Sequence, residues 1–394
     1  MQFRLPLFAF LAFFAGASAH GDDRTRAVEK VGNPFITKYP NGEHIYSRNI
    51  WDMQVFNGRI YFGGGNSSNL GPSSNSGPVP IAAFDPRRKR FFVEETVADE
   101  QIDVIRLFGN DLIIPGHDAT QGWDWGNFYK RTRSGKWNMH RNIPKAVHVY
   151  DLLATEERWF AAIGVPDGLA AVAVSSDSGA SWVNQLLGEG RVYNFLQVGS
   201  DVYAVKLCKK ASTSYSCISL LQDDGRFRPL YDLGAAELFP DTTGSLARTR
   251  VVRSLPLNSQ TLYIGAKKHN DHQSKPFGVF SATSRDGILR VNRIDLPPGH
   301  VPRDILVHKD SVFLLTSEES DGATVNRVLR STKSDTSEWR ELVSFRHQTF
   351  ARSFEFLSNA FYFGMGCEVS DPEDWQLDEL KLETGDILRL RIRL

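Results

Sequence analysis

Asn57-Gly58-Arg59-Ile60-Tyr61-Phe62-Gly63 combines a polar turn with a short apolar strand, and this combination recurs six more times along the chain. The other six apolar segments are Leu112-Ile113-Ile114-Pro115, Trp159-Phe160-Ala161-Ala162, Val202-Tyr203-Ala204-Val205, Leu262-Tyr263-Ile264-Gly265, Val312-Phe313-Leu314-Leu315 and Phe361-Tyr362-Phe363-Gly364. Their spacing of about 50 residues is typical of a four-stranded propeller blade. One hairpin cannot bury both of its faces, whereas seven around an axis share a core. The sequence therefore predicts an all-β fold, a single seven-bladed β-propeller.

Outer strand pairs are predicted between successive inner hairpins, because apolar and polar residues alternate there on both sides of a turn. The clearest examples are residues 126–143, 170–187 and 325–343. The last inner hairpin is followed by residues 380–394, which predict a further hairpin around Thr384-Gly385. We expect this C-terminal hairpin to complete the first blade, beside the strand that begins near Tyr46, and so to close the ring without a free edge.

The N-terminal residues predict an exported protein. Residues 1–19 combine Arg4, an apolar run and the cleavage pattern Ala17-Ser18-Ala19, as a signal peptide does. The apolar run is too short to span a bilayer, and no second apolar stretch of spanning length follows it. We expect a secreted monomer, extracellular or periplasmic, with no membrane span. Residues 20–45 are predicted to lead into a propeller of residues 46–394.

The three cysteines are consistent with export, because an oxidising compartment permits disulfides. Cys208 and Cys217 flank a polar loop and would lie opposite each other if that loop joins neighbouring strands. We predict a disulfide between them, the alternative being two unpaired thiols. Cys367 is then left over, and we expect it to be buried.

One outer hairpin carries a sharper signature. Ser175-Ser176-Asp177-Ser178-Gly179-Ala180-Ser181-Trp182 resembles the Asp-box of sialidase-like propellers, with Ser in place of Thr. Degenerate copies lie at residues 133–137 and 333–339. In such a box the Asp binds turn amides, Gly adopts a positive φ and Trp packs between neighbouring sheets. The resemblance implies a propeller fold and a link to carbohydrate, and it assigns no catalytic residue.

Basic residues recur at the starts of the predicted inner strands, in Arg48, Arg191, Arg250, Arg303 and Arg352, and His148 takes the equivalent place in a sixth repeat. Strand starts and return-strand ends lie on the same face of a propeller. The segments that follow the return strands supply Asn66, His117, Asp118 and Trp123. Converging guanidinium groups favour a carboxylate or sulfate ligand, with Trp123 as a platform for a sugar ring. The alternative is that each arginine pairs separately with a surface carboxylate.

His117, His148 and Tyr150 are the candidate catalytic residues. His148 and Tyr150 are two apart on a strand and therefore point to the same side. Beside arginines that neutralise a carboxylate, a His or Tyr is suited to remove the proton α to it. The alternative is that these side chains are core residues satisfied by backbone groups. His269 and His272 are spaced too loosely for a metal site, so we predict no cofactor and leave a metal ion on the axis open.

Three functions remain open at this point. Lys and Arg total 46, as do Asp and Glu, so net charge gives no reason to expect nucleic acid. The favoured function is a lyase that acts on an anionic oligo- or polysaccharide by β-elimination, because the site is similar to that of uronate-specific polysaccharide lyases built on seven-bladed propellers. A sialidase-like hydrolase is a second possibility, although the Phe-Arg-Ile-Pro motif of that family is missing and Arg141-Asn142-Ile143-Pro144 lies in the wrong repeat. The third is a non-catalytic propeller that binds a glycan or a protein.

Overall fold

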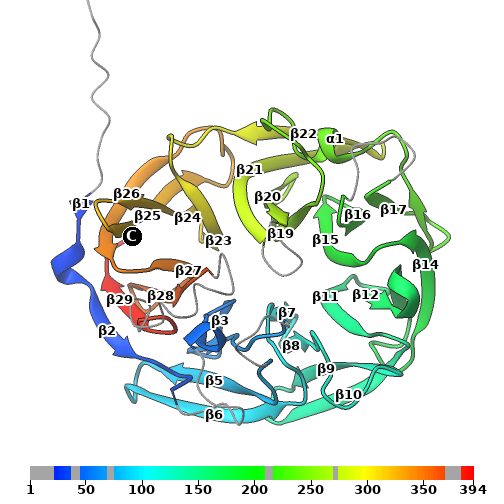
Figure 1. Cartoon of the computed structure of the whole chain (residues 1–394), viewed down its shortest axis with the longest axis horizontal. Coiled ribbons are helices and arrows are strands. Elements are labelled where there is room, and N and C mark those ends of the chain that lie inside the picture. Colours follow the sequence, from blue (N-terminus) through cyan, green and yellow to red (C-terminus); the bar gives the residue numbers. More distant parts are fainter. Residues whose placement is uncertain (1–21, 37–44, 69–74, 209–215, 269–273, 369–382) are drawn as a thin grey trace, which may run out of the picture.

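Seven small antiparallel sheets surround a central axis in the computed structural model, which confirms the seven-bladed β-propeller (Figure 1). The structure describes residues 22–36, 45–68, 75–208, 216–268, 274–368 and 383–394. The predicted signal peptide lies outside them. Within these residues no helix has the length and the apolar composition that crossing a bilayer requires.

Blades I to VI each take four consecutive strands, with the first strand nearest the axis. Blades I to III comprise β3 (Met53–Phe56), β4 (Arg59–Phe62), β5 (Val79–Asp85) and β6 (Arg90–Val97); β7 (Arg106–Phe108), β8 (Asp111–Pro115), β9 (Trp125–Arg131) and β10 (Trp137–Pro144); and β11 (His148–Ala154), β12 (Trp159–Val165), β13 (Leu169–Ser175) and β14 (Val183–Glu189). Blades IV to VI comprise β15 (Val192–Val198), β16 (Asp201–Lys206), β17 (Ile218–Leu221) and β18 (Phe227–Pro229); β19 (Thr249–Pro256), β20 (Gln260–Lys268), β21 (Ser274–Arg285) and β22 (Ile288–Ile294); and β23 (Val301–His308), β24 (Ser311–Ser320), β25 (Ala323–Thr332) and β26 (Arg340–His347). Short helical turns lie at Thr25–Ala27, Ile45–Arg48, Pro166–Gly168 and α1 (Ala235–Leu238).

Blade VII closes the ring with strands from both ends of the chain. It pairs β27 (Phe350–Leu357) with β28 (Ala360–Gly366), β28 with β29 (Ile387–Arg391), and β29 with β2 (Glu29–Gly32). β1 (Asp22–Asp23) adds a short parallel strand to β26 of blade VI. The segment expected to lead into the propeller therefore contributes strands of its own.

The predicted place of the C-terminal hairpin is wrong. Residues 380–382 lie outside the described part of the chain, and β29 completes the last blade rather than the first. The physical reason is that blade I already receives an outer pair, β5 and β6, from the chain that follows its inner hairpin. The last inner hairpin, β27 and β28, is not followed by two further strands of its own. Its two outer strands are therefore β29 and the N-terminal β2.

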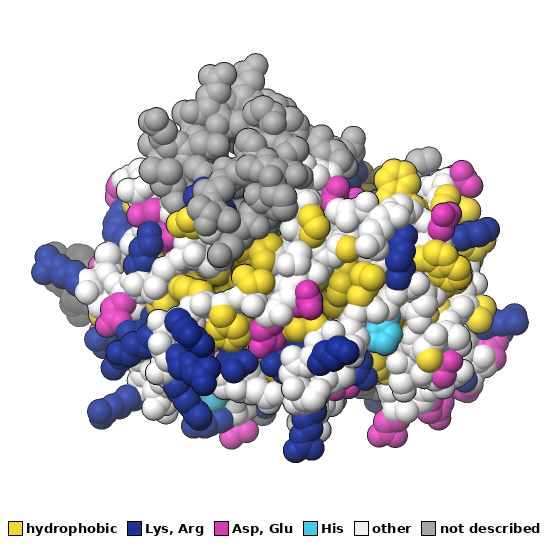
Figure 2. Space-filling view, turned by 90° about the horizontal axis from the view of Figure 1, so that it is seen from below, with side chains coloured by type: hydrophobic (Ala, Val, Ile, Leu, Met, Phe, Trp, Pro, Cys, Tyr) yellow, Lys and Arg dark blue, Asp and Glu magenta, His cyan; other side chains and the backbone are white. Residues whose placement is uncertain are grey.

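The core lies between the sheets, where apolar side chains of neighbouring blades meet. Figure 2 views the propeller from the edge formed by blades I and II, and Lys and Arg side chains gather at the lower left of this view. The central strand of each blade carries the largest buried side chains; Tyr61, Tyr203, Tyr263 and Tyr362 are fully buried.

Buried aspartates join neighbouring blades near the axis. Asp52, Asp151 and Asp304 each accept one N–H from the following residue and one from the inner strand of the next blade. The donors in the next blades are Ile105, Phe195 and Phe354, at 2.7, 3.2 and 3.2 Å. These bonds satisfy amides that the irregular inner strands leave without a ladder partner, and they fix the rotation of one blade against the next.

The Asp177 turn of blade III is held by local hydrogen bonds. Asp177 accepts the Ser181 N–H at 2.8 Å, and Ser175 Oγ accepts the Gly179 N–H at 2.8 Å. Gly179 has a φ of 87°, and Trp182 is buried. The turn thus stabilises the outer hairpin and contributes nothing to the central cavity.

The predicted disulfide is confirmed. Cys208 follows β16, Cys217 precedes β17, and the two are bonded with their Cα atoms 5.0 Å apart. Cys367 lies outside the disulfide and is buried, where its N–H donates to Asn49 Oδ1 at 2.8 Å.

We expect alkylation of the unreduced, denatured protein to label one thiol per chain, that of Cys367. The disulfide closes a loop of about ten residues, so its removal in Cys208→Ser/Cys217→Ser should lower the free energy of unfolding by about 2–3 kcal/mol. Intact-mass spectrometry and urea unfolding measure the two effects. Three labelled thiols would contradict the bond.

Candidate functional site

A central cavity of about 740 Å³ opens on the face where the second strands of the blades end. Its lining comes from all seven blades, because the start of each inner strand and the loop after each return strand meet there. The described residues that line it include seven basic side chains against three carboxylates: Arg191, Arg248, Arg250, Arg253, Lys268, Arg303 and Arg352, with Asp103, Asp118 and Glu368. The cavity is therefore basic, although the chain as a whole has no net charge.

Four of the five predicted arginines line this cavity, namely Arg191, Arg250, Arg303 and Arg352. Arg48 does not, because it ends the helical turn Ile45–Arg48 rather than lying on an inner strand. Its Cβ and carbonyl oxygen lie close to Gly385 of blade VII instead. The position nearest the axis in blade I belongs to Trp51.

Local strand geometry explains why residues two apart both face the cavity. Three pairs line the cavity together: His148 and Tyr150 on β11, Arg191 just before β15 with Tyr193 on it, and Arg250 and Val252 on β19. Alternate side chains of a strand share one side. Each of these inner strands has a bulge at the second residue of the pair, and in β15 and β19 the residue that follows, Asn194 or Arg253, lines the cavity as well.

His117 and His148 come from adjacent blades and meet as predicted, with ring centroids 6.1 Å apart. His148 Nδ1 lies 3.0 Å from the carbonyl oxygen of His117. A carbonyl oxygen only accepts hydrogen bonds, so this contact assigns the proton to Nδ1 and leaves Nε2 unprotonated, with its lone pair free to accept a proton. Tyr150 stacks on His148 at 5.2 Å, and Asp103 Oδ2 lies 3.0 Å from His117 Nδ1.

The two histidines have opposite protonation preferences. Burial lowers the pKa of His148 to about 2, and the positive charges of Arg191 and His117 contribute to this decrease. Burial also opposes the charged form of His117, but the ion pair with Asp103 outweighs it and raises the pKa of His117 above its usual value. At neutral pH, His148 is therefore a neutral imidazole, whereas Asp103 favours the charged form of His117.

Tyr150 is held as a neutral phenol. Burial raises the pKa of Tyr150 well above its usual range, Tyr193 adds to this effect and Arg191 opposes it. Arg191 Nη1 donates to the Tyr150 oxygen at 2.5 Å. The phenol hydrogen remains available as a donor, so the site holds a base and an acid side by side.

Two further arginines hold a carboxylate of the chain itself. Arg303 Nη1 and Arg352 Nη2 lie 3.2 and 3.4 Å from Glu368 Oε1. Arg352 also stacks over Trp51, with its guanidinium carbon 4.4 Å from the ring centroid. On this side of the cavity, the two arginines are therefore already paired with a carboxylate of the chain.

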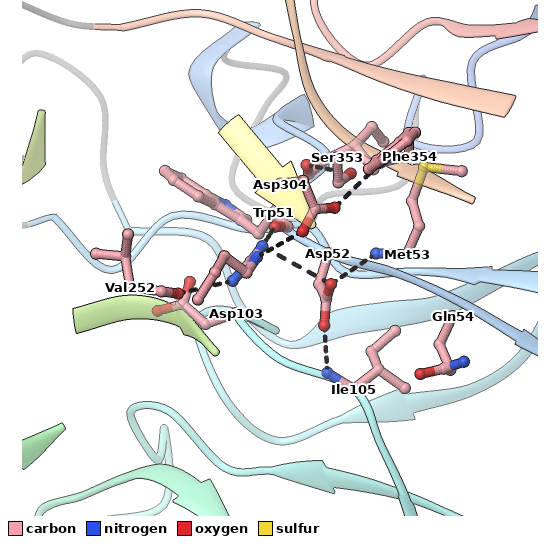
Figure 3. A network of polar contacts seen from close by, with 12 residues as sticks. Trp51, Asp52, Met53, Gln54, Asp103, Ile105, Val252, Asp304, Ser353 and Phe354 are labelled. Atoms are coloured by element: carbon pink, nitrogen blue, oxygen red, sulfur yellow. Dashed lines mark hydrogen bonds and ion pairs between the residues drawn. The ribbon is translucent and has the colours of Figure 1, made fainter. Parts of the chain in front are cut away.

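An ion network forms the floor of the cavity (Figure 3). Arg253 lies 3.4 Å from Asp304 and 3.7 Å from Asp52, and it donates to the carbonyl oxygen of Trp51. Burial raises the pKa of Asp304 to about 7, which the positive charge of Arg253 opposes. Asp52 and Asp304 also bind backbone amides of two blades, so the floor is rigid.

The remaining predicted residues are Asp118, Trp123 and Asn66: one lines the cavity, one lies at its rim and one is outside the lining. Asp118 lines the cavity with its Oδ2 3.4 Å from His148 Nδ1, and burial raises its pKa to about 6. Trp123 is 58% exposed and donates a hydrogen bond to Asp118, which places its indole at the rim. Asn66 is fully buried and is not part of the lining, where Ser67 and Ser68 take its place.

No group of three metal-ligating side chains is found among the residues that the structure describes. His269 and His272 lie outside those residues, so the prediction for this loop stays a prediction.

Several lining residues escaped prediction, namely Asp103, Tyr193, Arg248, Arg253, Lys268 and Glu368. Aligning the inner strands on His148-Val149-Tyr150-Asp151 and Arg191-Val192-Tyr193-Asn194 would have identified Tyr193 and Arg253 as members of the same ring of positions. Asp103 and Glu368 give no such signal, because they lie outside the strands.

The fold and the site together define a seven-bladed β-propeller with a basic central cavity that holds a neutral histidine. No protein-family model and no curated protein matches the chain. Among solved structures, the extracellular domain of a hybrid two-component system from B. thetaiotaomicron aligns with a TM-score of 0.52 and 10% identity, over 88% of this chain and 41% of that one. This chain thus spans less than half the length of that neighbour.

A chain of the mitotic checkpoint complex aligns with a TM-score of 0.51 and 9% identity over 100% of both chains. An alpha-L-arabinanase from Penicillium chrysogenum aligns with a TM-score of 0.40 and 11% identity, over 86% of this chain and 93% of that one. Likeness at these identities shows the fold alone, so the function has to be argued from the site.

Proposed function

We propose that this protein is a secreted polysaccharide lyase that cleaves a uronic-acid-containing glycan by β-elimination. The observation that carries the proposal is the neutral imidazole of His148, whose Nδ1 is fixed by the His117 carbonyl beside Tyr150 and Arg191 in one cavity. Export is part of the proposal and is supported by the disulfide, because such bonds persist in oxidising compartments.

Arg191 and Arg250 are the groups that we propose to bind the uronate carboxylate. Within the described part of the chain, neither has a carboxylate at ion-pair distance, unlike Arg303 and Arg352. Arg250 Nε is buried and has no hydrogen-bond partner among the described residues. A buried guanidinium N–H without an acceptor costs free energy, which a bound carboxylate would recover through a bidentate pair.

The elimination needs a base and an acid, and the site supplies both. In a uronate the C5–H bond is α to the carboxylate, and the arginines stabilise the negative charge that develops there. His148 Nε2 takes the C5 proton, and the electron pair of the C5–H bond forms the C4–C5 double bond. The C4–O bond breaks, and the leaving oxygen takes the phenol proton of Tyr150. The products are an unsaturated uronate and a new chain end, with no other reactant.

A sialidase-type hydrolase has less support from the geometry. Its nucleophile requires a tyrosine paired with a carboxylate, whereas the side-chain hydrogen bond to Tyr150 in the described structure comes from Arg191. The rim residue Trp123 suits either enzyme as a platform for a neighbouring sugar, since exposed indole rings stack on apolar sugar faces.

The test is incubation of the purified protein with a panel of polyuronates while ultraviolet absorbance is recorded. Elimination creates a double bond conjugated with the carboxylate, so absorbance should grow with time on at least one polymer. Polymers that bind without a change in absorbance or in reducing ends would identify a binding propeller instead.

We expect Arg250→Gln to lower kcat/KM by an amount equivalent to about 2–4 kcal/mol, because it removes charge stabilisation of the developing carbanion. The matched control is Arg226→Gln, which removes an exposed arginine in the turn between β17 and β18. Steady-state kinetics on the polyuronate identified above measure both variants. Equal rates in Arg250→Gln and the control would contradict the assigned carboxylate site.

A further inference from the structure

A second basic surface lies between blades I and VII, away from the central cavity. We call it the basic groove, and it consists of Arg87, Arg88, Lys89, Arg90, Arg389, Arg391 and Arg393. Arg87, Arg88 and Lys89 lie in the turn between β5 and β6, and Arg90 begins β6. Arg389 and Arg391 lie on β29, and Arg393 follows it. Apart from Arg389, which pairs with Glu29, all of them are exposed.

The groove has a defined shape. It encloses about 650 Å³ between the β5–β6 turn and the end of β29, with the turn Ser358-Asn359 and Tyr362 contributing to its lining. The Ile392 N–H donates to the carbonyl oxygen of Asn359, which fixes the arginine-bearing segment against that turn.

The groove lies on the face opposite the cavity. β28 and β29 are antiparallel neighbours, and Gly364 at the cavity end of β28 pairs with Ile387, whereas Ala360 at the other end pairs with Arg391. In Figure 2, dark blue Lys and Arg side chains gather at the lower left, on this outer part of the molecule. Binding here is therefore separable from binding in the central cavity.

Most charges in the groove make no close ion pair with another described residue, and the Glu29 carboxylate, which pairs with Arg389, attracts Lys89 and Arg391 at longer range. Arg87, Lys89, Arg90, Arg391 and Arg393 have no carboxylate within 4.0 Å among the described residues, and Arg88 reaches Asp85 only at 3.9 Å. Like charges gathered on one surface repel one another and destabilise the fold. The chain as a whole has no net charge, yet its cations are concentrated in this groove. The groove is therefore complementary in charge to a polyanion.

We infer that the basic groove binds a linear anionic polysaccharide. Arg389 and Arg391 are two apart on β29, so their side chains start roughly 6.7 Å apart on one side of the strand, and Arg393 lies two residues beyond its end. Such a row matches the repeating charges of an extended polymer, and guanidinium groups bind sulfate or carboxylate in bidentate fashion.

The lining of the groove disfavours other polyanions. Its aromatic residue, Tyr362, is buried, so no exposed ring is available to stack on nucleic-acid bases. Its apolar members, Pro86, Ala360 and Ile392, are buried or half-buried, so they form no apolar face for insertion into a lipid surface.

Dextran sulfate is the probe, because it carries no uronate and is no substrate for the proposed elimination. We expect the unmodified protein to bind it, and Arg87→Gln/Lys89→Gln/Arg391→Gln to bind about tenfold or more weakly, with a smaller slope of log Kd against log salt by about one per side chain replaced. The matched control, Arg133→Gln/Lys136→Gln/Arg226→Gln, makes the same change in net charge at exposed sites of other blades.

Each outcome decides the inference. A loss confined to the groove variant supports it, whatever the result of the polyuronate assay. Equal losses in the two triple variants would show that net charge alone governs binding, and a loss confined to Arg250→Gln would assign the binding to the central cavity. Binding to phosphatidylserine vesicles or duplex DNA without binding to dextran sulfate would also overturn it.

Discussion

His148→Asn should lower kcat by about 10²–10⁴-fold while leaving the fold intact, the usual contribution of a positioned general base. The amide nitrogen of Asn keeps a donor for the His117 carbonyl, but the variant has no basic nitrogen in place of Nε2. The measurement is kcat on the polyuronate that the panel identifies, together with the melting temperature.

The matched control is His140→Asn, because His140 lies on an outer strand of blade II and stacks on Phe128 away from the cavity. It should leave kcat unchanged. A His148→Asn variant that melts earlier but turns over at an undiminished rate would show that His148 is structural.

The pH dependence of stability offers a second readout of His148. Its folded pKa of about 2 lies below the usual value, so protons bind more tightly to the unfolded chain. The contribution of this group to stability is complete above the unfolded pKa of about 6.5 and is lost as pH falls below it. His148→Asn removes that loss, so its free energy of unfolding should decrease less than that of the unmodified protein between about pH 7.5 and pH 5.

Asp151→Ala should cost about 3–5 kcal/mol of folding free energy, the usual penalty for removing one partner of a buried ion pair. Asp151 is 1% exposed, receives Arg106 Nε at 2.9 Å and accepts the Leu152 and Phe195 amides. The variant would leave a buried guanidinium and two amides without their acceptor and would loosen blade III against blade IV.

Urea unfolding of Asp151→Ala measures this effect, and Asp224→Ala is the control. Asp224 pairs with Arg228 on the surface, at 3.1 Å between exposed side chains, so its removal should change the unfolding curve little. A midpoint for Asp151→Ala that matches the control would show that the buried aspartates do not hold the blades together.

Sequence patterns revealed the architecture because each blade repeats the same physical requirement, an apolar central strand after a polar turn. They misplaced the closure of the ring for an equally physical reason. β2 consists of Glu29, Lys30, Val31 and Gly32, which is too short and too polar to stand out as a strand, so only the three-dimensional pairing with β29 reveals it.

The sequence predicted the site residues whose position follows from the repeat of inner strands. It did not predict those whose position depends on a helical turn or a bulge in the backbone. His148 and Tyr150 lie on the inner strand β11, Arg191 directly precedes β15, and the three converge as the repeat predicts. Arg48 ends a helical turn before β3 instead of lying on an inner strand, and its side chain is not among those that line the cavity. Arg253 falls outside simple strand alternation because β19 has a bulge between Val251 and Arg253, and its partners Asp52 and Asp304 come from two other blades.

The most direct test of the proposed elimination is mass spectrometry of the oligosaccharides formed from a polyuronate in water labelled with heavy oxygen. The account predicts products lighter by one water than saturated oligomers of the same length, with no label at the cleaved bond. Saturated products that carry the label would identify a hydrolase and contradict the roles given to His148 and Tyr150.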